Sequence, residues 1–178
     1  MKNFKFQDSQ NQKKLFLIFE NYFSNENDLD NILYFDKKCI SIYDHWLTEE
    51  EEFKYITRSV FLDKLESNNF KPTEIKKKFN NYYEAEKKSM SFYFYIFSNF
   101  KVYGCNKNKK FYEFLNIQSF FHACEQSIRE EKFLDLFIPS IQCIILGNFD
   151  FTNVLLYREK KDLLNISVFV KKSGLFLI

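Results

Sequence analysis

The sequence is poor in glycine, proline and histidine, and each shortage excludes a class of site. Of the 178 residues, three are Gly, two are Pro and two are His. So few glycines leave no glycine-rich loop of the kind that cradles phosphates. Two histidines exclude a multi-histidine metal site, and the absence of a CxxC pair removes the usual cysteine signal for zinc. Because HExxH and GxSxG are also missing, we expect no metal, no cofactor and no catalytic residue.

Long apolar runs are missing as well. The amino-terminal residues MKNFKFQDSQNQ contain no apolar core of a secretory signal. The longest uncharged stretches, 89–100 and 136–149, are shorter than the roughly 20 apolar residues that a membrane-spanning helix requires. The four cysteines are widely spaced, which indicates reduced thiols in a chain without an export signal. These features predict a cytoplasmic protein with no membrane partner.

Aromatic residues are abundant: 24 Phe, 11 Tyr and one Trp. Each aromatic side chain buries a large area, so this content favours a well-filled core. A chain of this size buries roughly two thirds of its unfolded surface and needs no disulfide or metal to fold. No internal repeat, linker or change in composition marks a boundary. We therefore predict a single domain over residues 1–178.

Hydrophobic spacing predicts helices through most of the first two thirds of the chain. Thr48 and Glu51 form the capping-box pattern at the start of one of them. Residues 91–97 (SFYFYIF) leave two interpretations open, because an aromatic run fits either the end of a long helix or a buried strand. Two apolar runs, 32–35 and 39–43, flank a charged tripeptide and predict a hairpin. The predicted helices cover residues 9–23, 49–67, 72–98 and 119–132.

The last third of the chain predicts the order strand, strand, helix, strand. Apolar runs at 141–146 and 154–157 are joined by a turn-like tetrapeptide. Helical spacing covers 162–172, and Gly174 follows where a helix C-cap belongs. The final apolar run, 175–178, suits a strand docked in a sheet. The predicted fold class is α+β, with a helix-rich N-terminal two thirds and a small sheet completed by a C-terminal β-β-α-β segment.

Charge is distributed unevenly, although the net charge is only +2. Residues 15–53 hold ten acids against two lysines, and residues 54–110 hold thirteen bases against five acids. A fold can place two such segments on separate acidic and basic faces, each suited to a different partner. An acidic face can mimic phosphate toward a basic active site and can speed association by charge attraction.

Catalytic interpretations depend on residues that have simpler explanations. The run 49–52 offers four carboxylates, but the helix dipole alone favours acids in the first turn of a helix. Asp44-His45 with a distant cysteine would give a nucleophilic set, yet no local signature surrounds any cysteine. His122 and Cys124 are two positions apart on a predicted helix, where their side chains point apart and cannot share a metal easily. An enzyme without a compact motif, using scattered carboxylates, stays an open alternative.

Residues 142–178 carry a short pattern within the predicted strand, strand, helix, strand order. The residues that define it are Asp150, Thr152, Ser173, Gly174 and Leu175. The pattern resembles the tail of small bacterial immunity proteins, which neutralise a toxin partner. The resemblance implies a non-catalytic inhibitor that blocks its partner by stoichiometric binding. Toxins of this kind often attack nucleic acid, so the resemblance makes a nuclease a reasonable partner.

Two binding hypotheses follow. In the first, a protein partner such as a cognate toxin contacts the acidic segment and its aromatics. The predicted contact residues are Asp28, Asp30, Tyr34, Asp36, Tyr43, Trp46, Glu49 and Glu50. In the alternative, the lysine-rich region 71–110 of an accessory protein binds nucleic acid through phosphate contacts and base stacking. The residues for that alternative are Lys76, Lys77, Lys78, Tyr82, Tyr83, Lys87 and Lys88. The sequence pI of about 8.2 is low for a dedicated nucleic-acid binder, which favours the protein partner.

Overall fold

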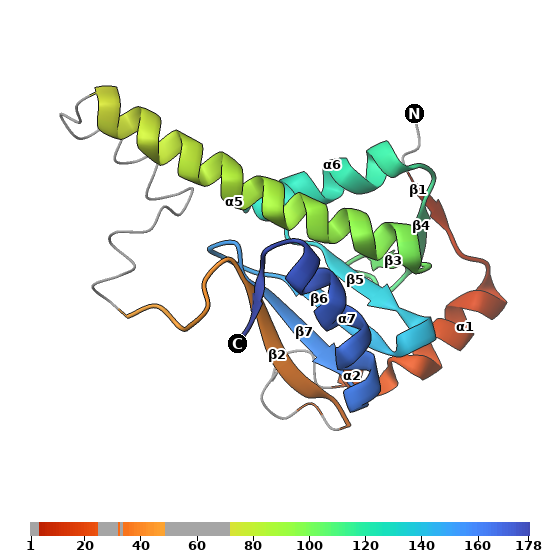
Figure 1. Cartoon of the computed structure of the whole chain (residues 1–178). Coiled ribbons are helices and arrows are strands. Elements are labelled where there is room, and N and C mark those ends of the chain that lie inside the picture. Colours follow the sequence, from red (N-terminus) through yellow and green to blue (C-terminus); the bar gives the residue numbers. More distant parts are fainter. Residues whose placement is uncertain (1–3, 25–31, 33, 49–71) are drawn as a thin grey trace.

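The structure is a computed structural model that describes residues 4–24, 32, 34–48 and 72–178. Within these residues an eight-stranded antiparallel sheet has helices on both faces, which confirms the α+β class (Figure 1). The strands are β1 (Phe4–Phe6), β2 (Asp36–Ser41), β3 (Tyr103–Cys105), β4 (Phe111–Phe114), β5 (Asp135–Ile138), β6 (Cys143–Gly147), β7 (Asn153–Tyr157) and β8 (Phe176–Leu177). The helices are α1 (Ser9–Ile18), α2 (Glu20–Ser24), α5 (Pro72–Asn99), α6 (Ile117–Ile128) and α7 (Lys160–Lys172), with a 3-10 turn at Pro139–Ile141.

The strand order in the sheet is β1-β4-β3-β5-β6-β7-β2-β8. Strands β5, β6 and β7 form a meander at the centre, and each pairs with its neighbour in sequence. Strand β2 comes from the first quarter of the chain and is inserted between β7 and β8. Strands from the two ends of the chain therefore lie at opposite edges of one sheet, β1 at one edge and β8 at the other.

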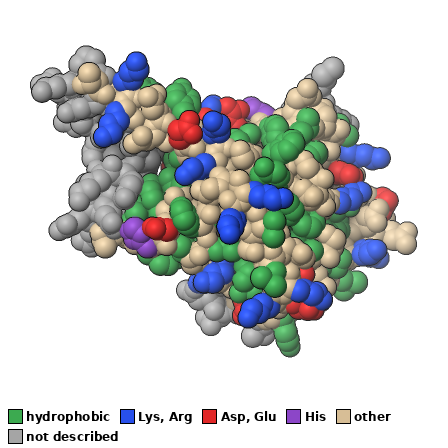
Figure 2. Space-filling view, in the orientation of Figure 1, with side chains coloured by type: hydrophobic (Ala, Val, Ile, Leu, Met, Phe, Trp, Pro, Cys, Tyr) green, Lys and Arg blue, Asp and Glu red, His purple; other side chains and the backbone are tan. Residues whose placement is uncertain are grey.

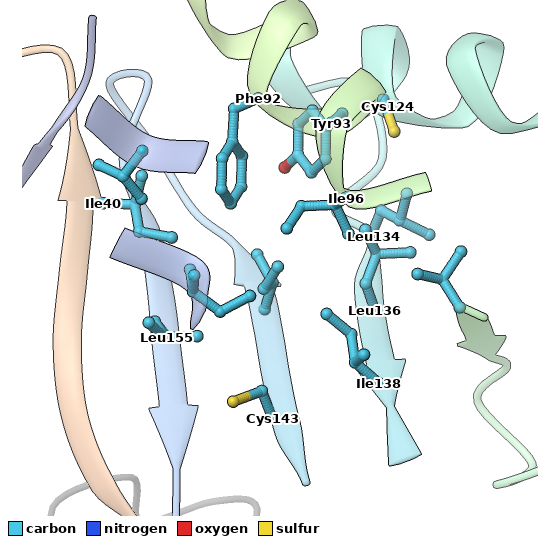
Figure 3. Close-up of a cluster of buried hydrophobic side chains, with 14 of the residues drawn as sticks. Ile40, Phe92, Tyr93, Ile96, Cys124, Leu134, Leu136, Ile138, Cys143 and Leu155 are labelled. Carbon is cyan, nitrogen blue, oxygen red and sulfur yellow. The ribbon is translucent and has the colours of Figure 1, made fainter. Parts of the chain in front are cut away.

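The central strands are buried on both faces, which explains why they read as continuous apolar runs. Alternate residues of β5 divide between the two sides: Leu136 and Ile138 face α5, α6 and α7, and Phe137 faces α1 and α2. Figure 3 shows the first of these layers, in which strand side chains meet the buried residues of α5 and α6. Its labelled members are Ile40, Phe92, Tyr93, Ile96, Cys124, Leu134, Leu136, Ile138, Cys143 and Leu155.

The second layer is an aromatic cluster beneath the two short amino-terminal helices. Phe19 and Phe23 lie with their ring centroids 5.1 and 5.6 Å from that of Phe137. Phe111 of β4 completes the cluster, 5.1 Å from the same ring. Aromatic pairs at these separations stabilise a core beyond the area that they bury. This layer holds α1 and α2 against the sheet.

Residues 91–97 belong to α5, so the strand alternative for them is wrong. The helix continues to Asn99 because Ala85, Phe92 and Ile96 form one buried stripe that packs on the sheet. The predicted helix 49–67 lies outside the described residues.

The predicted hairpin of residues 32–35 and 39–43 is wrong. Tyr34 has a positive φ of 67° and belongs to a turn, and the charged tripeptide that follows it opens strand β2. These three residues are exposed, whereas the second half of β2 is buried and pairs with β8 at Ile40 and Ser41. The short strand β1 was also not predicted, and the sheet is larger than the small one that the sequence indicated.

The carboxyl-terminal segment contains β6, β7, α7 and β8 in that order. Gly174 has a φ of 69° after α7, and the N–H of Leu175 donates to the carbonyl of Val170 at 3.0 Å. This is the Schellman-type ending that a glycine permits. Cys39 and Ile178 then exchange two backbone hydrogen bonds of 2.9 Å, so the last residues are docked on β2.

Gly104 of β3 gives a direct test of sheet packing. A Cβ at this position would collide with the ring of Tyr112, its cross-strand partner. We expect Gly104→Ala to lower the free energy of unfolding by about 1–3 kcal/mol, because the ring must move. Urea denaturation of the single variant, and of Gly104→Ala in a Tyr112→Leu background, measures the coupling. An equal loss in both backgrounds would contradict the packing shown here.

Candidate functional site

One end of the sheet gathers four connections that are far apart in the sequence. Strands β2 and β6 finish at this end, and β5 and β7 begin there, as their registers show. The β3–β4 hairpin turns at the same end because Cys105 pairs with Phe111. We call this the loop end. Its connections are the segment 42–48 after β2, the hairpin tip 106–110, the α6–β5 connection 129–134 and the β6–β7 turn 148–152.

The loop end concentrates unusual backbone conformations. Four of the six non-glycine residues with positive φ among the described residues lie there: Lys109, Glu130, Asp150 and Phe151. Such conformations cost about 1–3 kcal/mol each and persist only where surrounding contacts impose them. Here the backbone N–H of Asp150 donates to Oε1 of Glu130 at 2.9 Å, which ties two connections together. Oδ1 of Asn106 accepts two backbone N–H groups of the hairpin tip at 3.0 Å each.

Large aromatic side chains are exposed on these connections. Trp46, the single tryptophan, is 66% exposed, and Phe149 of the β6–β7 turn is 56% exposed. Phe133 is also exposed, and its ring meets that of Phe149 edge to face at 4.8 Å. The pair joins the α6–β5 connection to the β6–β7 turn on the outer surface. Exposed aromatic groups that contact one another are typical of binding surfaces.

The segment after β2 is attached to the same end through Ser41. Its hydroxyl accepts the backbone N–H of Tyr43 at 3.1 Å and lies 3.5 Å from Oγ1 of Thr152 in the β6–β7 turn. Asp44 and His45 follow as an exposed pair whose Oδ1 and Nδ1 are 2.6 Å apart. The three connections that follow β2, α6 and β6 carry four acids against two bases. They are Asp44, Glu130, Glu131 and Asp150 against Arg129 and Lys132.

Helix α5 is fixed to the loop end and extends past it. The ring of Tyr82 packs on Phe151 at 5.1 Å, and Glu86 accepts from Nε of Arg129 at 2.7 Å. Arg129 is also paired with Glu125 of α6 at 2.7 Å. The amino-terminal half of α5 therefore projects beyond the sheet, as Figure 1 shows.

The structure divides the predicted protein-binding residues between two places. Tyr43 and Trp46 lie at the loop end, but Tyr34 and Asp36 lie at the opposite end of β2. A strand of this length spans about 17–20 Å, so the two groups form separate surfaces. The remaining four, Asp28, Asp30, Glu49 and Glu50, lie outside the described residues.

Tyr34 and Asp36 line a separate hollow of about 500 Å³ with Arg158. The guanidinium of Arg158 lies 5.0 Å above the ring of Phe35, and its Nη2 donates to the carbonyl of Ile18 at 2.6 Å. Because these contacts hold the arginine against α1, we interpret the hollow as a structural junction of β2, β7 and α1.

The lysines predicted to bind nucleic acid are exposed on α5, at Lys76, Lys77 and Lys87. Tyr82 is engaged with Phe151, so only Tyr83 of the two tyrosines presents a largely exposed ring. Figure 2 shows lysine and arginine side chains spread over the face formed by α5 and α7, with hydrophobic groups between them. Sequence reasoning missed the α7 lysines because they follow α5 by more than sixty residues. Lys88 is half-buried, and the side chain of Lys78 lies outside the described part.

Three of the four thiols are buried core residues, and Cys105 is half-buried. Burial raises the pKa of Cys39, Cys124 and Cys143, which disfavours the nucleophilic thiolate. Within the described residues no three His, Cys, Asp or Glu side chains converge as metal ligands. His122 is exposed and lies 4.0 Å from its helical neighbour Glu125. No described helix has both the length and the apolar character needed to cross a bilayer.

Two hollows adjoin the hairpin tip, with volumes of about 920 and 960 Å³. Their walls combine lysines with aromatic rings, a combination that the sequence did not reveal because the residues come from five elements. The exposed pair Phe133 and Phe149 was also missed, although an aromatic residue within the turn 147–150 was a usable signal.

Comparisons with protein-family models, curated proteins and solved structures found no match for this chain.

Proposed function

We propose that this chain is a non-catalytic inhibitor of the toxin-neutralising immunity type, which binds a protein partner through its loop end. One observation carries the proposal: the exposed Phe133 and Phe149 stand on connections whose backbone is held in strained conformations, and the exposed Trp46 stands on the segment that Ser41 joins to them. Strain that neighbouring contacts maintain is a recurrent mark of functional surfaces. The partner's active site would be covered rather than chemically altered.

The aromatic groups supply the kind of contact that dominates protein interfaces. Tryptophan and tyrosine are enriched among the few residues that carry most binding energy. Trp46 and Phe149 expose large apolar areas to water, which is unfavourable in free energy. A partner that covers these areas removes that free-energy cost. The hydrogen bond from the backbone N–H of Asp150 to Glu130 fixes the turn beside Phe149, so this turn loses less conformational entropy when a partner binds.

Apart from the lysine-rich hairpin tip, charge on the connections that follow β2, α6 and β6 favours a basic partner. Four acids against two bases on the three connections give a surface that attracts positive charge. Arg129 is already paired with Glu86 and Glu125, which leaves Lys132 as the available base of these three connections. An enzyme that cuts nucleic acid has a basic substrate site, so a nuclease toxin fits this surface.

The resemblance of residues 142–178 to small immunity proteins supports the choice of partner class. Two of the residues that carry it, Asp150 and Thr152, belong to the β6–β7 turn at the loop end. Thr152 contacts Ser41 and so connects that turn to the segment that carries Trp46. The resemblance and the exposed aromatics thus point to one surface.

Substitution at the two ends of β2 tests the proposal. The full chain is used to capture its partner from lysate of its source organism, and the stoichiometry is measured by calorimetry with the purified pair. We expect a 1:1 complex that inhibits the partner's activity. Trp46→Ala and Phe149→Ala should each raise Kd about 30-fold or more, the effect of removing a central aromatic contact.

The matched control is Tyr34→Ala, which removes an aromatic group that is 74% exposed at the opposite end of β2. Its Kd should stay within twofold of the unmodified protein. Loss of binding in Tyr34→Ala with no change in the other two variants would move the interface away from the loop end. A complex that leaves the partner's activity intact would contradict the inhibitor function.

A further inference from the structure

The hairpin tip 106–110 contributes to the walls of two adjoining hollows. The hollows share Phe6, Asn106, Asn108 and Lys109, so they meet at the tip. One extends between β1, β4 and α6, and the other extends along α1. We call the two together the hairpin groove. It contains neither Trp46 nor Phe149, although Phe133 contacts Phe149, and its proposed ligand is independent of the proposed protein partner.

Exposed aromatic rings line the hairpin groove along its length. Phe4 and Phe6 of β1 are 43% and 46% exposed and flank the ring of Tyr112, at 4.8 and 6.0 Å. Phe16 of α1 and Phe133 of the α6–β5 connection add two further exposed rings. Rings that are packed on one side and open on the other present flat apolar faces to a ligand. Unpaired nucleic acid bases bind to such faces by stacking.

Positive charge follows the same groove. The lining lysines are Lys13, Lys107, Lys109, Lys110 and Lys132, and the lining acid is Asp135. Lys109 has a structural role, because its Nζ donates to the carbonyl of Phe23 at 3.2 Å and fixes the hairpin tip on α2. The other four lysines are exposed, and no salt bridge to a described residue engages them. They are therefore available to phosphate groups.

We propose that the hairpin groove binds a short stretch of single-stranded nucleic acid, with its phosphates on the lysines and its bases on the exposed rings. Lysines interleaved with stacking aromatics are the usual chemistry of such sites. Two adjoining hollows of about 920 and 960 Å³ exceed what a single nucleotide fills, which favours a strand of several nucleotides. An acidic peptide would match the lysines but would leave Phe4 and Phe6 without stacking partners. A duplex keeps its bases paired and could not use the rings.

The charge part of the proposal is tested by fluorescence anisotropy with a labelled twelve-nucleotide oligothymidylate. The double variant Lys107→Glu with Lys110→Glu should bind at least tenfold more weakly at low salt. The slope of log K against log salt should fall by about 1.4, since each phosphate contact on a single strand contributes about 0.7. The matched control, Lys87→Glu with Lys171→Glu, makes the same change of charge on α5 and α7 and should change Kd less than twofold.

The stacking part has its own variant. Phe6→Leu keeps an apolar side chain but removes the ring, so Kd should rise about fivefold while the salt slope stays the same. Thermal unfolding of each variant checks that the fold is retained. The proposal is overturned by no binding at low salt, by equal weakening in the control variant, or by polyglutamate that competes as well as unlabelled oligonucleotide.

Discussion

Raising the pH above about 9 is expected to destabilise this protein steeply. The reason is a set of thiols and phenols that the fold keeps protonated. Burial raises the pKa of Cys124 and Tyr93 well above their ordinary values, and both side chains lie in the layer beneath α5 and α6. Burial also raises the pKa of Cys143 and of Tyr112, each to about 12. Each of these groups must hold its proton for the protein to stay folded.

The direction of the effect follows from proton linkage. In the unfolded chain Cys143 loses its proton near its ordinary pKa of 9.0, whereas the folded protein retains it up to a pKa of about 12. Between these values the unfolded state binds fewer protons, so stability falls by about 1.4 kcal/mol per pH unit for this group alone. The stabilisation is complete below pH 9 and is lost as the pH rises. Tyr112 acts in the same direction from its ordinary value of 10.0.

Urea denaturation at a series of pH values from 7 to 10.5, with a reductant present, measures this loss. The midpoint should hold steady to about pH 8.5 and then fall with increasing slope. Cys143→Val is the control, because it removes one buried thiol with little change in volume. Above pH 9 the stability of this variant should fall less steeply than that of the unmodified protein, and the two slopes should differ by about 1.4 kcal/mol per pH unit. A midpoint that stays constant up to pH 10.5 would contradict the burial of these groups.

The parts of the fold that the sequence predicted well depend on local signals. Helix α7 and its ending at Gly174 follow from hydrophobic spacing and from a glycine at the position that needs positive φ. Helix α5 follows from the long apolar stripe that begins near Pro72. In each case the residues that decide the structure are close together in the chain.

The parts that could not be predicted depend on pairing between distant segments. The segment of β2 was predicted as a hairpin because its charged first half looks like a turn, whereas its partners β7 and β8 come from the other end of the chain. The candidate site also depends on pairing between distant segments. Trp46 was selected from its neighbours in sequence, but Phe149 and Phe133 become part of a surface only when β5, β6 and β7 align their ends. The hairpin groove likewise requires β1 beside β4, a pairing across more than one hundred residues.

Phe137→Ala is expected to have the largest effect of any single truncation in the layer beneath α1 and α2. The side chain of Phe137 is fully buried, and four rings surround it at centroid distances of 5.1–5.6 Å. Removing a buried phenyl group leaves a cavity that costs about 3–5 kcal/mol, because packed neighbours collapse only in part. The surrounding rings are Phe19, Tyr22, Phe23 and Phe111.

Loss of the Phe137 ring should destabilise α1 and α2 before the rest of the fold. These helices have ten and five residues, too few to persist without tertiary contacts. Phe137 is the ring that Tyr22 and Phe23 of α2 share with Phe19, the residue between the two helices. Hydrogen exchange should therefore show faster opening of residues 9–24 than of α5 in the variant. Phe94→Ala removes a phenyl group that is 45% exposed on α5 and should cost about 1 kcal/mol or less.

Equal destabilisation by the two substitutions would mean that Phe137 is not enclosed by the amino-terminal helices. The expected difference also links the core to the hairpin groove, because Phe23 both packs on Phe137 and accepts the hydrogen bond that fixes Lys109. A loosened α2 releases that bond, so the groove should lose its shape before the sheet unfolds. Oligonucleotide affinity should accordingly fall in Phe137→Ala at temperatures where the protein is still folded, and it should be unchanged in Phe94→Ala.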